Sequence, residues 1–260
     1  MAKDQTVLFH STVFGPIHSR RLGTSLGINL LPDDGKVCTF DCVYCEAGYN
    51  AQGTGTTGLP SLQRLEHDLE AKLKDMKAKG ETLDVITFSG NGEPTLHPRF
   101  REVVEIVNRL RDEYFPEAKT SVLTNSTRIF NPDVAAALRL VDNNILKLDS
   151  AIDPTMRLID NPTEKSFSIG RLIPALKQFA GEGIIQTMFL RGEHDGKRID
   201  NTTPEEIDAL IAAYKEIRPK SVMIYSIDRS TPEERLEKVS KEELAVIADK
   251  IRRAGIEVSF

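Results

Sequence analysis

The sequence predicts an α/β fold in which parallel β-strands alternate with α-helices along the chain. Six times, a short apolar segment is followed by a longer one with apolar residues at helical spacing. Parallel neighbours need a long crossover connection, so repeated strand–helix units indicate a parallel sheet. Six units are fewer than the eight of a closed barrel, and polar residues follow the strand ends. A partial barrel and a doubly wound open sheet both fit this pattern.

Apolar runs and helix-stop signals define the first three units. The predicted strands cover residues 22–30, 83–88 and 120–123, and a loop rich in glycine and cysteine runs from the first strand to about Pro60. The first two helices are marked by apolar stripes: Leu62, Leu65, Leu69, Leu73 and Met76, closed by Gly80, and then Phe100, Val103, Val107 and Leu110. The third helix starts at Asn131-Pro-Asp and runs through Leu140.

Helix caps define the last three units more clearly. The predicted strands cover residues 144–148, 184–190 and 221–227, with a last short strand ending at Phe260. One helix is expected over residues 168–180. Thr203-Pro-Glu-Glu opens the next helix with a cap, a proline at its first position and Glu206 as the capping-box acid. Ser240-Lys-Glu-Glu caps the last helix, whose apolar stripe is Leu244, Ile247 and Ile251.

The composition is that of an ordinary globular protein. Hydrophobic residues make up 40% and charged residues 28% of 260 residues. No apolar run approaches the length of a membrane span, and the N-terminus shows no secretory signal, so we expect no membrane association. A net charge of −5 argues against nucleic-acid binding by the whole surface but leaves room for a local basic patch.

All three cysteines lie in one short segment as Cys38, Cys42 and Cys45. A C-x3-C-x2-C spacing can hold one iron–sulfur cube from a single loop, and three thiolates leave the fourth iron without a protein ligand. A structural zinc site, with His10 or His18 as fourth ligand, and buried inert thiols are the alternatives. An odd number of clustered cysteines does not suit disulfides, so we expect a reducing, cytoplasmic location.

Further polar residues follow the predicted strands. Ser89-Gly90-Asn91-Gly92-Glu93-Pro94 ends the second strand, where glycines allow close backbone approach and Glu93 could accept from an ammonium group; a simple turn is the alternative. Later strand ends carry Thr124 and Asn125, then Lys147 and Asp149, which share one strand face, and then Tyr225, Asp228 and Arg229. Loop histidines usually face solvent, so we assign no role to His194.

The cysteine segment and the Gly-x-Gly-Glu-Pro segment, on successive strand ends, together resemble the radical S-adenosylmethionine (SAM) superfamily. The resemblance covers roughly residues 14–260 and implies a partial (β/α)6 TIM-like barrel, in one domain of residues 1–260 with residues 1–13 as an N-terminal extension. It implies that Cys38, Cys42 and Cys45 bind a [4Fe-4S] cluster whose fourth iron is chelated by SAM. Reductive cleavage of SAM would then give a 5′-deoxyadenosyl radical that abstracts hydrogen from an organic substrate. A separate flavodoxin or ferredoxin would supply the electron.

The same resemblance assigns roles to the remaining residues. Tyr44 would lie beside the adenine, and Gly90, Asn91, Gly92 and Glu93 would hold the methionyl ammonium. Thr124 and Asn125 would contact the ribose or the carboxylate. Lys147 and Asp149 would either pair with each other across the barrel interior or meet SAM or the substrate.

One further segment resembles a particular branch of this superfamily. Gly15-Pro16-Ile17-His18-Ser19-Arg20-Arg21-Leu22-Gly23, with Leu26-Gly27-Ile28-Asn29-Leu30, resembles the branch related to the wyosine-tRNA-forming enzymes. Arg20 and Arg21 could anchor an anionic ligand. This sequence has no fourth cysteine for the second cluster that those enzymes hold. A tRNA base, a partner protein that receives a glycyl radical and a small molecule stay open as substrates. An iron–sulfur electron carrier or redox sensor is the non-enzymatic alternative.

Overall fold

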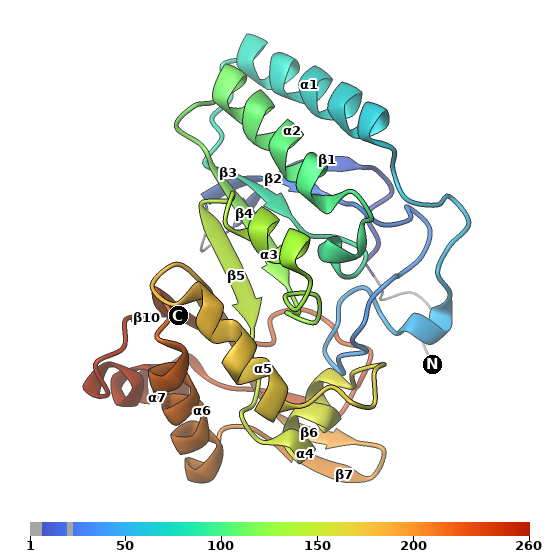
Figure 1. The fold of residues 1–260 in the computed structure, drawn as a ribbon. Coiled ribbons are helices and arrows are strands. Elements are labelled where there is room, and N and C mark those ends of the chain that lie inside the picture. The colour runs from blue at the N-terminus through green and yellow to red at the C-terminus, as the bar shows by residue number, and fades with distance from the viewer. Residues whose placement is uncertain (1–6, 20–22) are drawn as a thin grey trace.

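A parallel sheet with its strands in chain order forms the centre of the computed structural model, which describes residues 7–19 and 23–260 (Figure 1). The parallel strands, each paired with the one before it, are β2 (Gly23–Ile28), β3 (Val85–Phe88), β4 (Lys119–Thr124), β5 (Asn143–Lys147), β6 (Ile184–His194), β8 (Ser221–Ser226) and β10 (Val258–Ser259). A doubly wound sheet reverses its strand order at a switch point, and this order does not reverse. The partial barrel is therefore confirmed, with a sheet that is not closed among the described residues.

The crossover helices pack against this sheet. The α-helices are α1 (Leu62–Ala78), α2 (Phe100–Tyr114), α3 (Pro132–Leu138), α4 (Asp153–Asp160), α5 (Ile169–Leu176), α6 (Pro204–Ile217) and α7 (Lys241–Arg253). Three 3-10 turns are η1 (Asn50–Gln52), η2 (Pro94–Leu96) and η3 (Lys177–Phe179). Right-handed crossovers between adjacent strands bring successive helices to the same face of a sheet. Figure 1 shows α2, α3 and α5 on one side of the strands accordingly.

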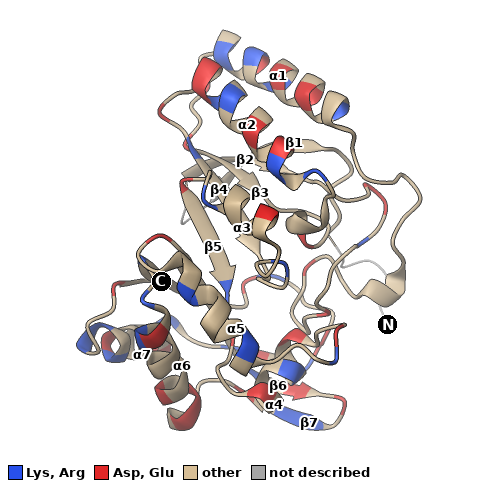
Figure 2. Ribbon diagram, in the orientation of Figure 1, with Lys and Arg blue, Asp and Glu red and all other residues tan. Residues whose placement is uncertain are grey.

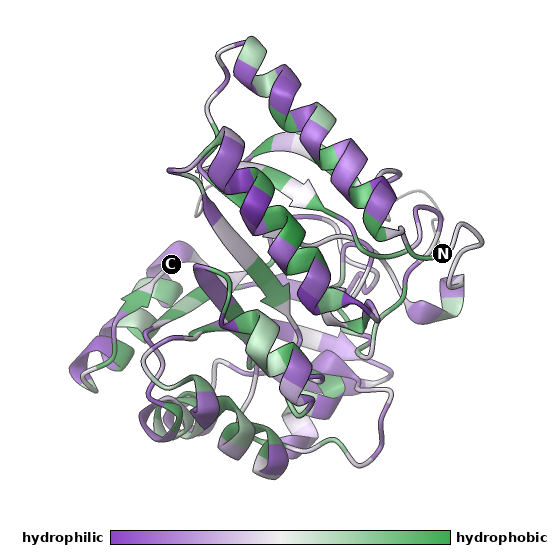
Figure 3. Cartoon of the chain, turned by 45° about the horizontal axis from the view of Figure 1, so that its top comes forward, coloured by the Kyte–Doolittle hydropathy of each residue, from purple (hydrophilic) through white to green (hydrophobic). Residues whose placement is uncertain are grey.

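The core lies between this helical layer and the sheet. All four residues of β3 are buried, as expected for a parallel strand covered on both faces. The predicted stripe of α1, from Leu62 to Met76, is buried as well. In Figure 3 the outer helices carry both hydrophilic and hydrophobic residues, because one helix face meets the sheet and the other meets water. No helix in the described part of the chain is long and apolar enough to cross a lipid bilayer.

An additional strand precedes the first parallel strand. β1 (Val13–Ser19) pairs antiparallel with β2, and the register shifts between Phe14 and Ile17. The sequence did not predict this strand, because Pro16 lies in its middle and proline is tolerated in sheets only at edges, starts or bulges. β1 is such an edge strand. The predicted anion anchor, Arg20 and Arg21, and the first residue of the predicted strand, Leu22, lie outside the described residues.

Two other regions differ from the sequence prediction. One helix was expected over 168–180, but the structure has α4 and α5 between β5 and β6, and η3 replaces the last turn of the expected helix. α4 has only eight residues, which is too short a segment to establish a helical repeat from the sequence. β6 also extends to His194 and pairs antiparallel with β7 (Lys197–Asp200) and β9 (Leu236–Lys238). Charged residues fill this extension, so hydrophobic patterning gave no signal for it.

The two predicted helix caps differ in their detail. The Thr203 hydroxyl accepts a hydrogen bond from the Glu206 amide, as predicted, but the Glu206 carboxylate accepts from the Ser150 hydroxyl at 2.7 Å. The capping box predicted there is therefore wrong, because the Glu206 carboxylate binds the Ser150 hydroxyl instead of the Thr203 backbone amide. At α7 the box is complete: Ser240 and Glu243 each accept from the other's backbone amide.

We expect Ser240→Ala to lower the free energy of unfolding by about 1 kcal/mol, because the change removes the side-chain half of the capping box. Urea denaturation followed by circular dichroism measures the loss. Ser168→Ala is the matched control, because Ser168 occupies the cap position of α5 without a capping hydrogen bond. Equal losses in the two variants would contradict this account.

Candidate active site

The three cysteines lie on the loop between β2 and α1, which neighbouring backbone holds from two sides. On one side, the Val37 amide donates to the Asn91 carbonyl and the Glu93 amide donates to the Val37 carbonyl, both at 3.0 Å. On the other side, the Val43 amide donates to the Ile159 carbonyl near the end of α4, at 2.9 Å. The glycine-rich segment after β3 is thereby joined to the loop immediately before Cys38.

Gly92 is required by this contact. Its φ is +134°, and a Cβ there would lie 1.9 Å from the carbonyl oxygen of Val37. Any other residue would push the two segments apart and occupy a backbone conformation that side chains rarely adopt. The glycine-rich segment therefore acts as a docking surface for the cysteine loop.

The three thiols form no disulfide and have polar neighbours. All three cysteines are free. The Cys38 sulfur accepts from the Phe40 amide and from the side-chain amide of Asn125, each at 3.5 Å. The Cys42 sulfur lies 3.6 Å from a carboxyl oxygen of Asp160. Burial, with the nearby charge of Glu93, raises the pKa of Cys38 to about 12, and burial raises the pKa of Cys42 well above its usual range. Metal binding would therefore have to release these protons.

Lys36 is buried inside the same loop, with 2% of its side chain exposed. Its ammonium donates to the Gly48 carbonyl at 2.6 Å and to a carboxyl oxygen of Asp41 at 3.3 Å. Burial alone would lower the pKa of Lys36, but the charges of the three cysteines and of Asp41 raise it. N–H donors at a sulfur and a buried cation beside three thiols suit an anionic iron–sulfur cluster. The donor set therefore fits the group that the sequence predicts.

Glu93, Thr124 and Asn125 form the side of the site next to Cys38. The buried Glu93 carboxylate accepts from the Thr124 hydroxyl and from the Asn125 amide, both at 2.7 Å, and also from the amide and hydroxyl of Thr95. Burial raises the pKa of Glu93 despite these hydrogen bonds. The Asn125 side chain also donates to the Thr39 hydroxyl at 2.8 Å. The ends of β3 and β4 and the cysteine loop thus form one hydrogen-bonded unit.

Tyr44, Lys147 and Asp149 form a second buried group beside Cys42. The Tyr44 hydroxyl donates to Asp149 and accepts from Lys147, whose ammonium lies 3.2 Å from the Asp149 carboxylate. Burial alone would lower the pKa of Lys147, but the charge of Asp149 raises it well above its usual range. Asp160 lies against the same charges, and burial followed by the charge of Asp149 raises its pKa well above normal. The predicted pairing of Lys147 with Asp149 is present, and Tyr44 joins it.

Asn91 uses its side chain to fix the surrounding backbone. Its amide donates to the carbonyls of Phe9 at 2.9 Å and Pro32 at 2.8 Å, and its oxygen accepts from the Phe9 amide. Both amide hydrogens therefore bind main chain. Asn91 joins the segment before β1 to the start of the cysteine loop.

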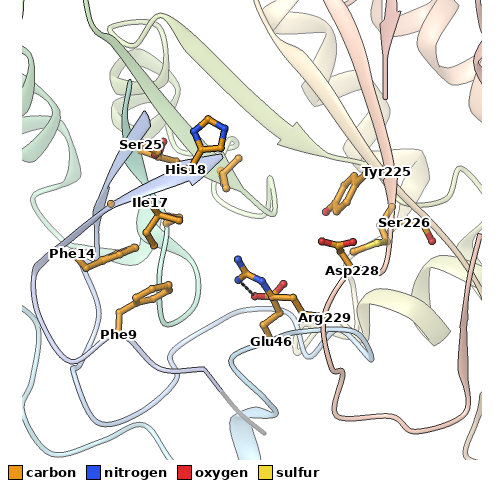
Figure 4. A pocket seen from close by; sticks show the side chains of 15 residues that line it. Phe9, Phe14, Ile17, His18, Ser25, Glu46, Tyr225, Ser226, Asp228 and Arg229 are labelled. Carbon is orange, nitrogen blue, oxygen red and sulfur yellow. Dashed lines mark hydrogen bonds and ion pairs between the residues drawn. The ribbon is translucent and has the colours of Figure 1, made fainter. Parts of the chain in front are cut away.

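A cavity of about 350 Å³ opens between the two edges of the sheet. Figure 4 shows Phe9, Phe14 and His18 on one side, and Tyr225 and Asp228 from the end of β8 and beyond on the other. Between these walls the Arg229 guanidinium donates to the Glu46 carboxylate at 2.6 Å. The predicted residues Tyr225, Asp228 and Arg229 thus line the same space, which has the size of a small-molecule pocket.

The histidines contribute little to a metal site. No three His, Cys, Asp or Glu side chains of residues 7–19 and 23–260 are grouped closely enough to hold a single metal ion. His10 contacts the Asp33 carbonyl at 2.9 Å, and His18 lines the cavity. His194 was expected to face solvent, but its side chain is only 17% exposed and lies 3.0 Å from the Glu233 carboxylate. Glu233 also accepts from the hydroxyl of Tyr49 in the cysteine loop.

Two buried ionisable residues beside the cysteines, Lys36 and Asp160, were not predicted from the sequence. Asp160 gave no signal, because its helix was not predicted. Lys36 gave a weak signal: it lies two residues before the first cysteine and is the only lysine or arginine between β2 and α1.

Comparisons with known proteins agree with this site. A sequence model of the radical SAM superfamily matches residues 34–150, which include the cysteines, the Gly90–Glu93 segment and the end of β5. The UPF0026 protein slr1464 of Synechocystis is 30% identical over 86% of this chain and 78% of its own length. A protein named GTPase Obg from Brachyspira hyodysenteriae is 28% identical over 93% of this chain, which spans only 34% of that protein.

Solved structures share the fold. A radical SAM methyltransferase from Sphaerobacter thermophilus superposes with a TM-score of 0.66 at 17% identity, over 90% of this chain and 65% of its own. TYW1, described with a lysine–pyruvate adduct bound, gives a TM-score of 0.61 at 17% identity, over 90% of this chain and 75% of its own. The structural matches show a shared fold, and the sequence matches show the family. The chain belongs to the radical SAM superfamily of enzymes, among the UPF0026 proteins.

Proposed function

We propose that this protein binds one [4Fe-4S] cluster on Cys38, Cys42 and Cys45 and uses it to cleave SAM reductively. The observation that carries the proposal is the hydrogen-bonded unit of cysteine loop, Gly90–Glu93 segment and β4 end. When bound, the cluster would supply the electron that yields a 5′-deoxyadenosyl radical, the hydrogen-abstracting species. The chain's own part is to position SAM, to exclude water and to hold the substrate at the 5′ carbon.

The two buried groups suggest how SAM would be held. The Glu93 carboxylate lies beside Cys38, so it can attract the methionyl ammonium to that side of the loop. Thr124 and Asn125 fix the Glu93 side chain and would contact the rest of SAM from the end of β4. Tyr44 is held by Lys147 and Asp149, which orients its ring for an adenine and leaves the ring little freedom to move.

We assign the cavity between Phe14 and Tyr225 to the substrate. Its volume suits a small molecule or a single residue or base of a larger one. In Figure 2 both signs of charge alternate over the helices, so a tRNA backbone has no continuous basic stripe in that view. A tRNA base fits the likeness to TYW1, and a glycyl radical on a partner protein is the second candidate. A small organic metabolite is the third candidate, and the cavity volume admits all three.

The free cysteines and the proposed cluster together favour a reducing, cytoplasmic setting with flavodoxin or ferredoxin as external electron donor.

Two measurements distinguish the other candidate functions. An electron carrier or redox sensor predicts that SAM leaves the paramagnetic resonance spectrum of the reduced cluster unchanged. A zinc protein predicts zinc without inorganic sulfide in anaerobically purified material.

Anaerobically reconstituted protein, reduced with dithionite and incubated with SAM, should release 5′-deoxyadenosine and methionine. Cys42→Ala should release neither, because two thiolates cannot hold the cube. Liquid chromatography of the quenched reaction measures both products. Fully loaded wild-type protein that forms neither product would overturn the proposed function.

Gly92→Ala should reduce the iron and sulfide content after reconstitution to a small fraction of the wild-type value. The added Cβ would meet the Val37 carbonyl at 1.9 Å and separate the loop from its docking surface. Gly58→Ala is the matched control, because its φ is +70° but no atom lies within 4 Å of the added Cβ. A Gly92→Ala protein with normal iron content would exclude this role of Gly92.

Glu93→Gln should weaken SAM binding at least about tenfold while the cluster is retained, because hydrogen bonds to charged groups contribute about 1.5–3 kcal/mol. Equilibrium dialysis of labelled SAM with reconstituted protein measures the affinity. Glu102→Gln, at an exposed glutamate paired with Arg99, is the control. Unchanged affinity in Glu93→Gln would remove this residue from the SAM site.

A further inference from the structure

A buried lysine at the start of the cysteine loop has too few partners for its charge. Lys36 is among the largest fully buried side chains of the described residues. Its ammonium carries three N–H donors, and its contacts with Gly48 and Asp41 account for two of them. Taking an ammonium out of water costs several kcal/mol unless a negative group compensates it. The lysine therefore needs a stronger negative partner than these contacts provide.

Asp41 is a weak counterion for this lysine. Its carboxyl oxygen lies 3.3 Å from the ammonium, and the same oxygen accepts from the Asn50 amide at 2.8 Å. Asp41 is also partly exposed, so water screens its charge. One shared, screened carboxylate does not balance a cation that is 2% exposed.

The loop itself offers the missing negative charge. Lys36 lies two residues before Cys38, and negative charge on any of the three cysteines would raise the pKa of its ammonium, which places it within electrostatic reach of all three sulfurs. It also shapes the loop, because its ammonium binds the Gly48 carbonyl and the Gly48 amide donates to the Cys45 carbonyl at 2.9 Å. A three-thiolate cluster is negative overall and becomes one unit more negative on reduction. A fixed cation beside it stabilises the reduced form more than the oxidised form.

We propose that Lys36 is a positioning residue with a second role: its buried ammonium raises the reduction potential of the cluster on Cys38, Cys42 and Cys45. This inference rests on the proposed function, since it requires the cluster. The hydrogen bond to Gly48 holds the loop, and the charge favours uptake of the electron. A series of substitutions that keep either the charge or the hydrogen bond distinguishes the role of the charge from the role of the hydrogen bond.

The test is a redox titration of reconstituted full-length protein, followed by paramagnetic resonance of the reduced cluster, for Lys36→Met, Lys36→Gln and Lys36→Arg. Met and Gln remove the charge, and Gln keeps a donor for Gly48; Arg keeps the charge. Met and Gln should lower the ratio of reduced to oxidised cluster at least tenfold at a fixed potential, or about 59 mV for a one-electron couple. Arg should stay near the wild-type potential.

Lys79→Met is the matched control, because it removes the same charge from an exposed lysine paired with Asp75 at the end of α1. Potentials of Lys36→Gln and Lys36→Met equal to that of the control would overturn the proposal. If neither neutral variant holds a cluster, Lys36→Arg decides: a cluster retained at the wild-type potential only where the charge is kept assigns the effect to the charge, and loss of the cluster from Lys36→Arg as well would overturn the second role. Absence of a cluster from wild-type protein is a different outcome, which refutes the proposed function instead.

Discussion

The contact between Val37 and Gly92 is the constraint on which the rest of the site depends. It places the glycine-rich end of β3 against the cysteine loop at hydrogen-bond distance, with no room for a side chain. Glu93 follows directly, and its carboxylate accepts from Thr124 and from Asn125, whose side chain also donates to the Cys38 sulfur. The cysteine loop, the end of β3 and the end of β4 are far apart in sequence, and these hydrogen bonds fix their positions relative to one another. A loop of this length would otherwise have many conformations, and fixing them costs conformational entropy.

Charge is balanced locally inside the barrel. Lys147 faces Asp149, and Tyr44 lies between them, while Asp160 remains next to Cys42 with its pKa far above normal. Burial penalises each of these charges, so each one depends on its neighbours. Lys36 differs, because its carboxylate partner, Asp41, is partly exposed and also accepts from the Asn50 amide. The proposed cluster would supply the negative charge that this lysine lacks.

The sequence predicted the elements that carry strong periodicity or caps, and it failed where side chains carry no pattern. The α1 stripe and the Ser240 cap lie as expected, because burial and capping leave local signals. β1 contains a proline, α4 is short, and the β6 extension is charged, so tertiary pairing alone determines them. The site followed the same rule. Lys147 and Asp149 could be placed together from strand alternation, but the contact of Tyr44 with both depends on how the loop folds back.

The open sheet has a consequence for substrate choice. The cysteine side of the site is built by the cysteine loop with the ends of β3, β4 and β5, where hydrogen bonds tie the side chains to one another. The cavity lies between β1 and the end of β8, and its lining also includes Glu46, next to Cys45, and Ser89 and Leu123, next to Gly90 and Thr124. Its remaining walls come from β1, which carries Phe14 and His18, and from Tyr225 and Asp228 at and beyond the end of β8. Under the proposed function, the walls on β1 and β8 select the substrate, and the lining shared with the cysteine loop holds it close to the three cysteines.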